Sequence, residues 1–171
     1  NGCVARGTGN RTGSKLGNFR LQNCNGDWIE LHDQCGRPKV QFVVLVTEWC
    51  PQCERSMREL RGIEDEHSPA IDALYVLGEL GRNQPATLSA CARVANAKGV
   101  RVDELLVDPG FATTLSGGWV RPCTDENGSF GLPQTNILDG RDMTLRWESM
   151  CDGRQRGIDP NTIINELMTG G

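Results

Sequence analysis

The amino-acid sequence predicts an α/β sandwich with a mixed central sheet, and three observations support that prediction. Residues 40–46 form an apolar run that is hydrophobic on both faces, as the central strand of a covered sheet is. Segments with the pattern of strands alternate with amphipathic helical segments along the chain. Two pairs of expected strands surround Asn25-Gly26 and Asp139-Gly140, dipeptides typical of tight hairpin turns.

The first third of the folded chain contains a hairpin, the central strand and a helix. Residues 19–24 and 28–31 alternate between apolar and polar side chains, so we expect two antiparallel strands there. The central strand leads almost without a loop into a helix whose apolar residues recur at spacings of four and three. The acidic run at the end of this helix, residues 64–66, is expected to face solvent. The apolar stripe consists of Cys53, Met57 and Leu60.

The rest of the chain repeats this alternation. An amphipathic helix begins near Leu88 and ends at Gly99, because glycine readily takes the left-handed conformation of a C-terminal cap. Asp108-Pro109 can cap a brief helix and Asp159-Pro160 a final one, since proline fits the first helical turn. Further strands are expected over residues 73–77, 105–107, 133–138 and 143–147.

Two segments have the composition of irregular chain. Residues 1–15 are glycine-rich and polar without an apolar period, so we expect a disordered leader ahead of one domain over residues 16–171. Residues 117–130 are expected to form an inserted loop within that domain. The longest apolar run is far shorter than the ~20 residues that cross a bilayer, so we expect no membrane span.

Charge and cysteine content restrict the class of protein. The net charge is −4 and the sequence has no basic run, which argues against a nucleic-acid partner. Eight cysteines, an even number, favour disulfides formed in an oxidising compartment. We therefore expect an extracytoplasmic protein, periplasmic or secreted, in its mature form after cleavage of an export signal that is distinct from residues 1–15. Gly2-Cys3 matches the end of a bacterial lipobox, which makes Cys3 a candidate for a lipid anchor; a flexible tail with an incidental cysteine is the simpler alternative.

One motif points to chemistry, Trp49-Cys50-Pro51-Gln52-Cys53, where the central strand turns into a helix. Cys50 would lie at the helix N-terminus, where unpaired N–H groups and the positive end of the helix dipole stabilise a thiolate, the nucleophile of disulfide exchange. Cys53, one turn further on, can resolve a mixed disulfide and close a ring with Cys50. Pro51 costs no hydrogen bond in the first turn and stiffens the ring.

A zinc site is the alternative for two cysteines at this spacing. The sequence has no second pair of this kind, and its two histidines, His32 and His67, do not recur at ligand spacing from the cysteines. We therefore expect no metal and no organic cofactor, with the Cys50–Cys53 disulfide as the redox group and both histidines on the surface.

These features resemble the thioredoxin-like superfamily, in particular the extracytoplasmic TlpA-like thiol–disulfide oxidoreductases, which are related to the redoxin and AhpC/TSA group. The resemblance extends from Leu16 to Thr169. Besides the CxxC motif, the matching segments are Gly36-Arg37-Pro38, Leu106-Val107-Asp108-Pro109, Gly131-Leu132-Pro133 and 134–139.

The resemblance implies a three-layer thioredoxin-like sandwich with an added N-terminal hairpin and flanking helices. It also implies an enzyme that exchanges dithiol and disulfide with protein substrates, together with a redox donor or acceptor protein. In that family the proline at the position of Pro133 follows a cis peptide bond and packs against the active-site cysteines. The residue before it, Leu132 here, would pair with the substrate backbone, and Trp49 would shield the cysteines.

The chain departs from related patterns at two positions. Thioredoxins carry a buried acid in the strand before the motif, where this chain has Val44, so the proton of the resolving thiol must pass to water or to Glu48. Peroxiredoxins carry a proline at the position of Val43, although Thr47 matches the threonine of their motif. Two alternative functions therefore remain, a thiol peroxidase with an antioxidant role and a non-catalytic binding module whose CxxC is structural.

The six cysteines outside the motif allow many pairings. Cys24 and Cys35 flank the first hairpin, and Cys123 and Cys151 flank the second with its inserted loop, so we expect each of these two pairs to form a structural disulfide. Cys91 lies on the apolar stripe of its helix and is expected to be a buried, inert thiol.

Overall fold

A computed structural model describes residues 3, 6–122, 124, 131–150 and 157–170. It contains the strands and helices expected from the sequence, with small shifts at their ends. The strands are β1 (Arg20–Asn23), β2 (Trp28–Glu30), β3 (Val40–Thr47), β4 (Ile71–Glu79), β5 (Leu105–Val107), β6 (Gln134–Asp139) and β7 (Thr144–Glu148). The helices are α1 (Pro51–His67), α2 (Leu88–Lys98) and α3 (Pro160–Thr169), with short helical turns η1 (Leu31–Gln34), η2 (Pro109–Phe111) and η3 (Ala112–Ser116).

The strands form one seven-stranded sheet in the order β2-β1-β5-β4-β3-β6-β7. Strand β4 pairs in parallel with both β3 and β5, whereas the hairpins β1–β2 and β6–β7 are antiparallel and join the parallel strands in antiparallel fashion. All residues of β3 are buried, because β4 and β6 flank it and both of its faces are covered. The predicted mixed sheet with an added N-terminal hairpin is confirmed.

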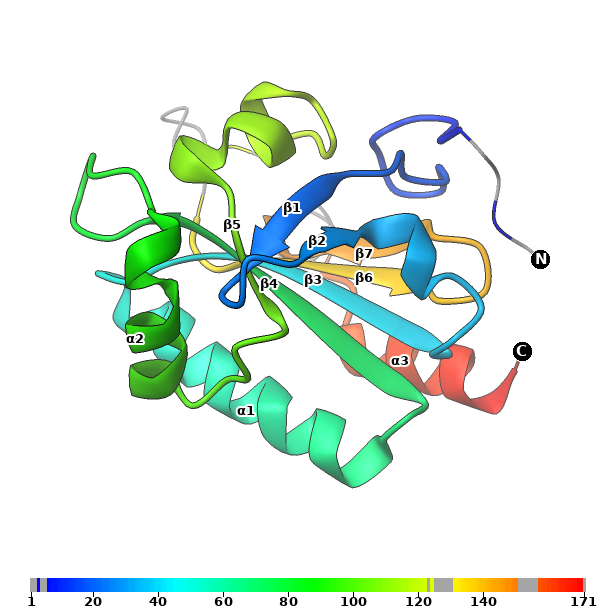
Figure 1. Ribbon diagram of the computed structural model, residues 1–171. Coiled ribbons are helices and arrows are strands. Elements are labelled where there is room, and N and C mark those ends of the chain that lie inside the picture. The colour runs from blue at the N-terminus through cyan, green and yellow to red at the C-terminus, as the bar shows by residue number, and fades with distance from the viewer. Residues whose placement is uncertain (1–2, 4–5, 123, 125–130, 151–156, 171) are drawn as a thin grey trace.

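The two faces of the sheet are covered differently. Helices α1, α2 and α3 all lie on one face, below the sheet in Figure 1. The other face is covered by irregular chain and short turns, above the sheet in the same view. Together with the sheet they make the three layers that the resemblance implies. The main residues that cover this second face are Leu16, Phe19, Leu31, Phe111 and Trp119.

The second half of the expected leader is ordered against the sheet. The Gly13 N–H donates to the Leu145 carbonyl over 2.8 Å, and the Leu145 N–H donates to the Ser14 carbonyl over 2.9 Å. The Leu16 N–H completes the contact with a 2.9 Å hydrogen bond to the Met143 carbonyl. The expectation of disorder is therefore not met for residues 8–15, because the backbone groups of β7 supply hydrogen bonds that composition alone cannot reveal.

The described part of the inserted loop packs onto the sheet. The Trp119 indole N–H donates to the Gly17 carbonyl over 2.7 Å, and the Trp119 ring meets the Phe19 ring edge-on at a centroid distance of 5.0 Å. Residues 123 and 125–130 of this loop lie outside the described residues. Trp119 thus anchors the start of the loop through core packing.

Two disulfides outside the motif correct the expected pairing. Cys24 is bonded to Cys91, with a Cα–Cα distance of 5.0 Å, and Cys35 is bonded to Cys3, with a Cα–Cα distance of 5.9 Å. The predicted Cys24–Cys35 bridge is wrong. The β1–β2 hairpin reverses the chain, so Cys35 lies beyond the start of β1, whereas Cys24 follows the end of β1. The prediction of a free Cys91 thiol is also wrong. Strand β1 pairs with β5 and α2 packs on β5, so Cys24 at the end of β1 lies beside Cys91 of α2.

Two further cysteine expectations are affected. A lipid anchor on Cys3 and the Cys3–Cys35 disulfide exclude each other, because both would use the same sulfur atom. The expected bridge between Cys123 and Cys151 involves residues outside the described part of the chain.

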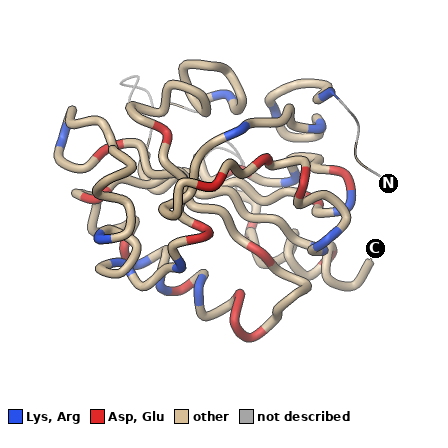
Figure 2. Tube along the Cα trace, in the orientation of Figure 1, with Lys and Arg blue, Asp and Glu red and all other residues tan. Residues whose placement is uncertain are grey.

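The surface carries charges of both signs. Figure 2 shows Lys and Arg residues interspersed with Asp and Glu residues on helices and loops alike. Within the described ranges, none of the helices combines the length and apolar character that crossing a bilayer requires.

Candidate redox site

The CxxC motif begins where β3 ends and α1 starts. Cys50 is the N-cap of α1, with an extended backbone, and its Sγ accepts a 3.1 Å hydrogen bond from the Cys53 N–H. Pro51 occupies the first helical turn, where its missing N–H leaves no helical hydrogen bond unmade. The sequence folds in this way because a buried strand meets a helix with only Glu48, Trp49 and the N-cap Cys50 between them.

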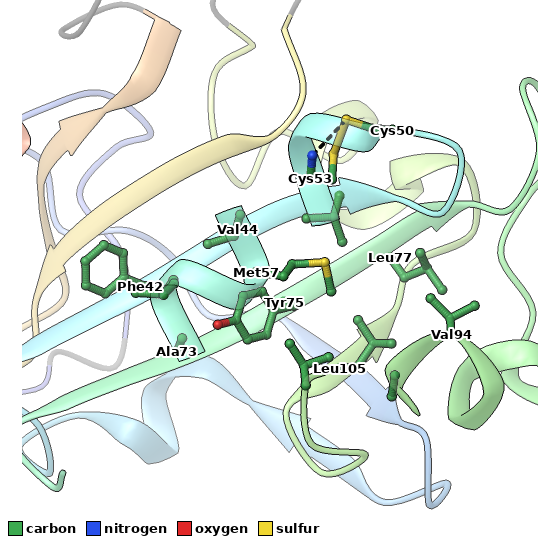
Figure 3. Packing of buried hydrophobic residues seen from close by; sticks show 14 of the residues in the cluster. Phe42, Val44, Cys50, Cys53, Met57, Ala73, Tyr75, Leu77, Val94 and Leu105 are labelled. Atoms are coloured by element: carbon green, nitrogen blue, oxygen red, sulfur yellow. Dashed lines mark hydrogen bonds between the residues drawn. A yellow bond between two sulfur atoms is a disulfide. The ribbon is translucent and has the colours of Figure 1, made fainter. Parts of the chain in front are cut away.

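The two motif cysteines form a disulfide with a Cα–Cα distance of 5.2 Å. Figure 3 shows both sulfur atoms at the end of α1, with Met57 one turn further along the helix in the same core. Cys50 is 5% exposed to solvent, whereas Cys53 is fully buried. Only Cys50 can therefore meet another molecule directly, and a thiolate at this N-cap would be stabilised by the helix dipole and the Cys53 N–H.

The loop before β6 lies against the disulfide. The Leu132 carbonyl oxygen is 3.7 Å from Cys50 Sγ, and the Leu132–Pro133 peptide bond is cis, as the resemblance implies. Leu132 also packs against the core on both faces of the sheet. The structure thus brings Leu132 and Pro133 to the motif from a distant part of the sequence.

Trp49 is half-buried beside the cysteines and carries a cationic neighbour. The Arg82 guanidinium lies over the Trp49 ring, with its Cζ atom 4.4 Å from the ring centroid. The indole N–H of Trp49 is buried without a hydrogen-bond partner among the described residues. Arg82 comes from the loop after β4, and the sequence contains no pattern that would associate it with Trp49.

Glu48, one of the two expected proton acceptors, is held in an ion pair. Its carboxylate accepts hydrogen bonds from the Arg93 guanidinium of α2, one of them 3.2 Å long. The hydrogen bond from Arg93 lowers the pKa of Glu48 more than partial burial raises it. A carboxylate that is stabilised in its ionised form is a weak base, so Glu48 is poorly suited to take the proton of Cys53. Val44, at the position of the thioredoxin acid, is buried in the same core as Cys53.

The expectation that residues 64–66 face solvent is wrong for Glu64. Only 3% of Glu64 is exposed, and its carboxylate accepts hydrogen bonds from the Ala73 N–H (3.0 Å) and the Tyr75 hydroxyl (3.1 Å). Burial, and then the nearby charge of Glu104, raise the pKa of Glu64 to about 8. The spacing of four from Leu60 places Glu64 on the buried stripe of α1, and that spacing is the signal that the acidic run obscures. Glu64 lies near the C-terminal end of α1, away from the cysteines.

Comparison with known proteins identifies the fold. No family model matches the sequence, and no curated protein matches it. Many solved structures do match the fold. A candidate protein disulfide isomerase from Bacteroides thetaiotaomicron covers 97% of this chain and 95% of its own, with a TM-score of 0.66 and 16% identity.

Two further structures extend the comparison. A candidate thiol:disulfide interchange protein DsbE from Chlorobium tepidum covers 92% of this chain and 99% of its own, with a TM-score of 0.65 and 16% identity. An exposed lipoprotein thioredoxin from Streptococcus pneumoniae covers 88% of this chain and 97% of its own, with a TM-score of 0.56 and 20% identity. The fold expected from the resemblance is confirmed: the chain has the thioredoxin-like fold.

Proposed function

We propose that this protein is a thiol–disulfide oxidoreductase that exchanges a dithiol and a disulfide with protein substrates through Cys50 and Cys53. The observation that supports this most is the asymmetry of the pair, because Cys50 caps α1 at the surface and Cys53 is fully buried behind it. Such an arrangement separates an attacking sulfur from a resolving one. Structures of similar fold include proteins described as a disulfide isomerase and as a disulfide interchange protein.

The reaction of the reduced protein has two steps. The Cys50 thiolate attacks one sulfur of a substrate disulfide, so an enzyme–substrate S–S bond forms and one substrate thiolate leaves and takes up a proton. Cys53 then loses its proton, attacks Cys50 Sγ and releases the second substrate sulfur as a thiol. Two electrons and two protons pass from the enzyme dithiol to the substrate, and a dithiol donor protein reduces the Cys50–Cys53 disulfide again. With a dithiol substrate and a disulfide acceptor, the same steps run in reverse.

The neighbouring residues have supporting roles in this proposal. A substrate segment can lie alongside Leu132, whose carbonyl is beside Cys50 Sγ, and pair with its backbone. Pro133 fixes the course of that loop, because its ring restrains the backbone. Trp49 covers the pair from the side of the loop after β4, where Arg82 holds its ring. The chemistry uses the disulfide itself and requires neither a metal nor an organic cofactor.

We place the protein in an extracytoplasmic compartment. The Cys24–Cys91 and Cys3–Cys35 disulfides would persist in such an oxidising environment. Two structures of similar fold are described as DsbE and as an exposed lipoprotein thioredoxin. A TlpA-like role in the periplasm fits this location.

The decisive experiment measures the reduction potential of the Cys50–Cys53 pair against glutathione, followed by the fluorescence of Trp49. A potential below about −230 mV would identify a reductant, and one above about −150 mV an oxidant. The Cys53→Ser variant is expected to accumulate a mixed disulfide with a peptide disulfide, whereas Cys50→Ser should form none. If Cys50 and Cys53 form no disulfide at any potential, the proposal is refuted and the non-catalytic binding module becomes the better explanation.

The peroxidase alternative has a separate readout. A thiol peroxidase would consume hydrogen peroxide rapidly and convert the Cys50 thiol to a sulfenic acid. We expect slow peroxide consumption, because Val43 replaces the proline of the peroxidase motif. Rapid consumption with loss of the Cys50 thiol would replace the proposed function by this alternative.

A further inference from the structure

A cavity of about 560 Å³ opens on the edge of the sheet at which β3 and β4 end. Its walls are mainly apolar, with Pro85 on one side and Phe111 and Leu115 on the other. Its polar lining residues are Glu79, which is the last residue of β4, Asn83, Ser116 and Thr124. Pro122 and Thr124 come from the inserted loop. In open α/β sheets this carboxyl edge is where ligands bind, and the volume is within the range of ligand sites.

One wall of the cavity is continuous with the redox site. The Glu48 N–H donates to the Glu79 carbonyl over 2.9 Å, which joins the end of β4 to the residues just before Cys50. The loop of residues 80–86 then contacts both the redox site and the cavity. Its Arg82 lies over Trp49, and its Asn83 and Pro85 line the cavity. This loop therefore links the two sites, because it contacts Trp49, which precedes Cys50, and also lines the cavity.

The loop of residues 80–86 is held in place by its own hydrogen bonds. The Leu80 N–H donates to the Gln84 carbonyl over 2.9 Å, and the Ala86 N–H donates to the Gly78 carbonyl over 2.9 Å. The Asn83 N–H donates to the Glu79 carboxylate, and Asn83 has a positive φ of 59°. The wall is thus formed before any partner binds.

The opposite wall is equally fixed. The Asp108 carboxylate accepts hydrogen bonds from the Thr113 N–H (2.9 Å), the Thr114 N–H (2.9 Å) and the Thr114 hydroxyl (2.7 Å), which ties η2 and η3 to the end of β5. Phe111 has a φ of 55° and is only 4% exposed, and its ring fills the space over Gly78. An aromatic residue in the left-handed region is costly and is kept only where surrounding structure enforces it.

We infer that this cavity is a specificity pocket for the substrate protein, and that it takes an apolar, aromatic-sized side chain on the segment that carries the cysteine attacked by Cys50. The inference rests on the proposed function and adds the substrate class. Burying an apolar side chain against apolar walls is favourable, because it removes apolar surface from water. An acidic side chain is disfavoured, because the Glu79 carboxylate repels it.

The test uses peptides with one disulfide that are identical except at one position beside the cysteine, which is Phe, Ala or Asp. Reduction by the protein, with dithiothreitol as the donor that regenerates Cys50 and Cys53, gives kcat/KM for each peptide. We expect the Phe peptide to exceed the Ala peptide by about tenfold, as pocket contacts of this size do, and the Asp peptide to be the slowest. Equal values for the Phe and Ala peptides would overturn the inference.

Variants assign the preference to the cavity. Leu115→Asp places a charge in the wall and is expected to bring the ratio of Phe to Ala peptides near one. Leu88→Asp is the matched control, because Leu88 lies on α2 and is 39% exposed, so both peptides should keep their rates. Ser116→Phe, at an exposed rim position, should lower the same ratio if Leu115→Asp does not fold. An unchanged ratio in both cavity variants would overturn the inference.

Two outcomes separate this inference from the proposed function. If the wild-type protein does not exchange even with oxidised glutathione, the proposed function itself is wrong. If it exchanges with glutathione but ignores the side chain beside the cysteine, only the pocket assignment is wrong. If a second copy of the chain fills the cavity, the protein will sediment as a dimer that Leu115→Asp dissociates, which would also overturn the substrate assignment.

Discussion

The guanidinium of Arg82 lies over the indole ring of Trp49, 4.4 Å from Cζ to the ring centroid, and Trp49 directly precedes the surface cysteine of the motif. A cation over an aromatic face is attracted by the ring quadrupole. The contact joins the loop after β4 to the residues that lead into α1. It thus fixes the position of the side chain that covers the disulfide.

Replacing Arg82 should loosen that cover. We expect Arg82→Ala to lower the free energy of unfolding by about 0.5–1 kcal/mol, the usual value of an exposed cation–π contact. It should also raise the rate at which dithiothreitol reduces the Cys50–Cys53 disulfide, because Trp49 can then move aside. Urea titration and stopped-flow fluorescence measure the two effects. Arg55→Ala, an exposed arginine on α1, is the control, and identical results for both variants would contradict the prediction.

The Cys24–Cys91 disulfide should dominate the stability that the cross-links provide. It closes a separation of 67 residues, whereas Cys50–Cys53 closes one of 3. Because a longer loop loses more entropy in the unfolded chain, we expect Cys24→Ser with Cys91→Ser to cost about 4 kcal/mol in a urea titration. Cys50→Ser with Cys53→Ser is the matched control and should cost much less. Equal losses would show that the entropy of the unfolded chain is not the main term.

Reduction should also distinguish these disulfides. Cys91 is fully buried, whereas Cys50 reaches the surface, so a mild reductant should open the motif first. Alkylation followed by peptide mass analysis would identify the thiols released at each stage. Early release of Cys91 would contradict the burial argument.

Glu64 predicts a stability that falls as the pH rises. Its pKa is about 8 in the folded protein and has the ordinary value of 4.5 in the unfolded chain. Between these values the folded state holds the additional proton, so the free energy of unfolding decreases through this window. These two values imply a loss of about 4 kcal/mol between about pH 5 and pH 9 in the wild type.

Glu64→Gln should remove most of this pH dependence. The amide keeps an oxygen to accept from the Ala73 N–H and cannot ionise. Urea titrations at several pH values measure the difference, with the exposed Glu66→Gln as control. If the free energy of unfolding of Glu64→Gln depends on pH as steeply as that of the wild type, other groups cause the dependence. Glu104 and Asp72, whose charges act on Glu64, are then the first candidates.

Glu48 should contribute little to the proton transfer from Cys53. Its ion pair with Arg93 and its lowered pKa keep it ionised at neutral pH. We expect Glu48→Gln to change the rate at which the mixed disulfide resolves by less than about twofold, with the same pH profile. Stopped-flow measurement of resolution between about pH 5 and pH 9 checks this, and a tenfold decrease would restore Glu48 as the base.

The elements that the sequence predicts well are those set by local pattern. The turn dipeptide Asn25-Gly26 and the apolar run of β3 are readable within a few residues, and so is the capping role of Cys50. Each depends on backbone preferences and burial periodicity, which neighbours in the sequence determine. The location of the motif follows directly from them.

The contacts that the sequence does not reveal join distant segments. Cys24 meets Cys91 because β1 pairs with β5, and the order of strands in the sheet decides that pairing. Arg82 reaches Trp49 through the course of a loop that has no distinctive pattern. Glu64 is buried because its backbone and tyrosine partners satisfy the carboxyl group, and those partners come from β4.

The ordered leader has a consequence for association between molecules. Strand β7 is the last strand of the sheet, and an unpaired edge is a template for strand addition by other chains. Gly13 and Ser14 form backbone hydrogen bonds with Leu145 of β7, and Lys15 lies opposite Thr144. Strand addition by another chain is therefore blocked at the start of β7, and the Cys3–Cys35 disulfide ties the blocking segment to the body of the protein.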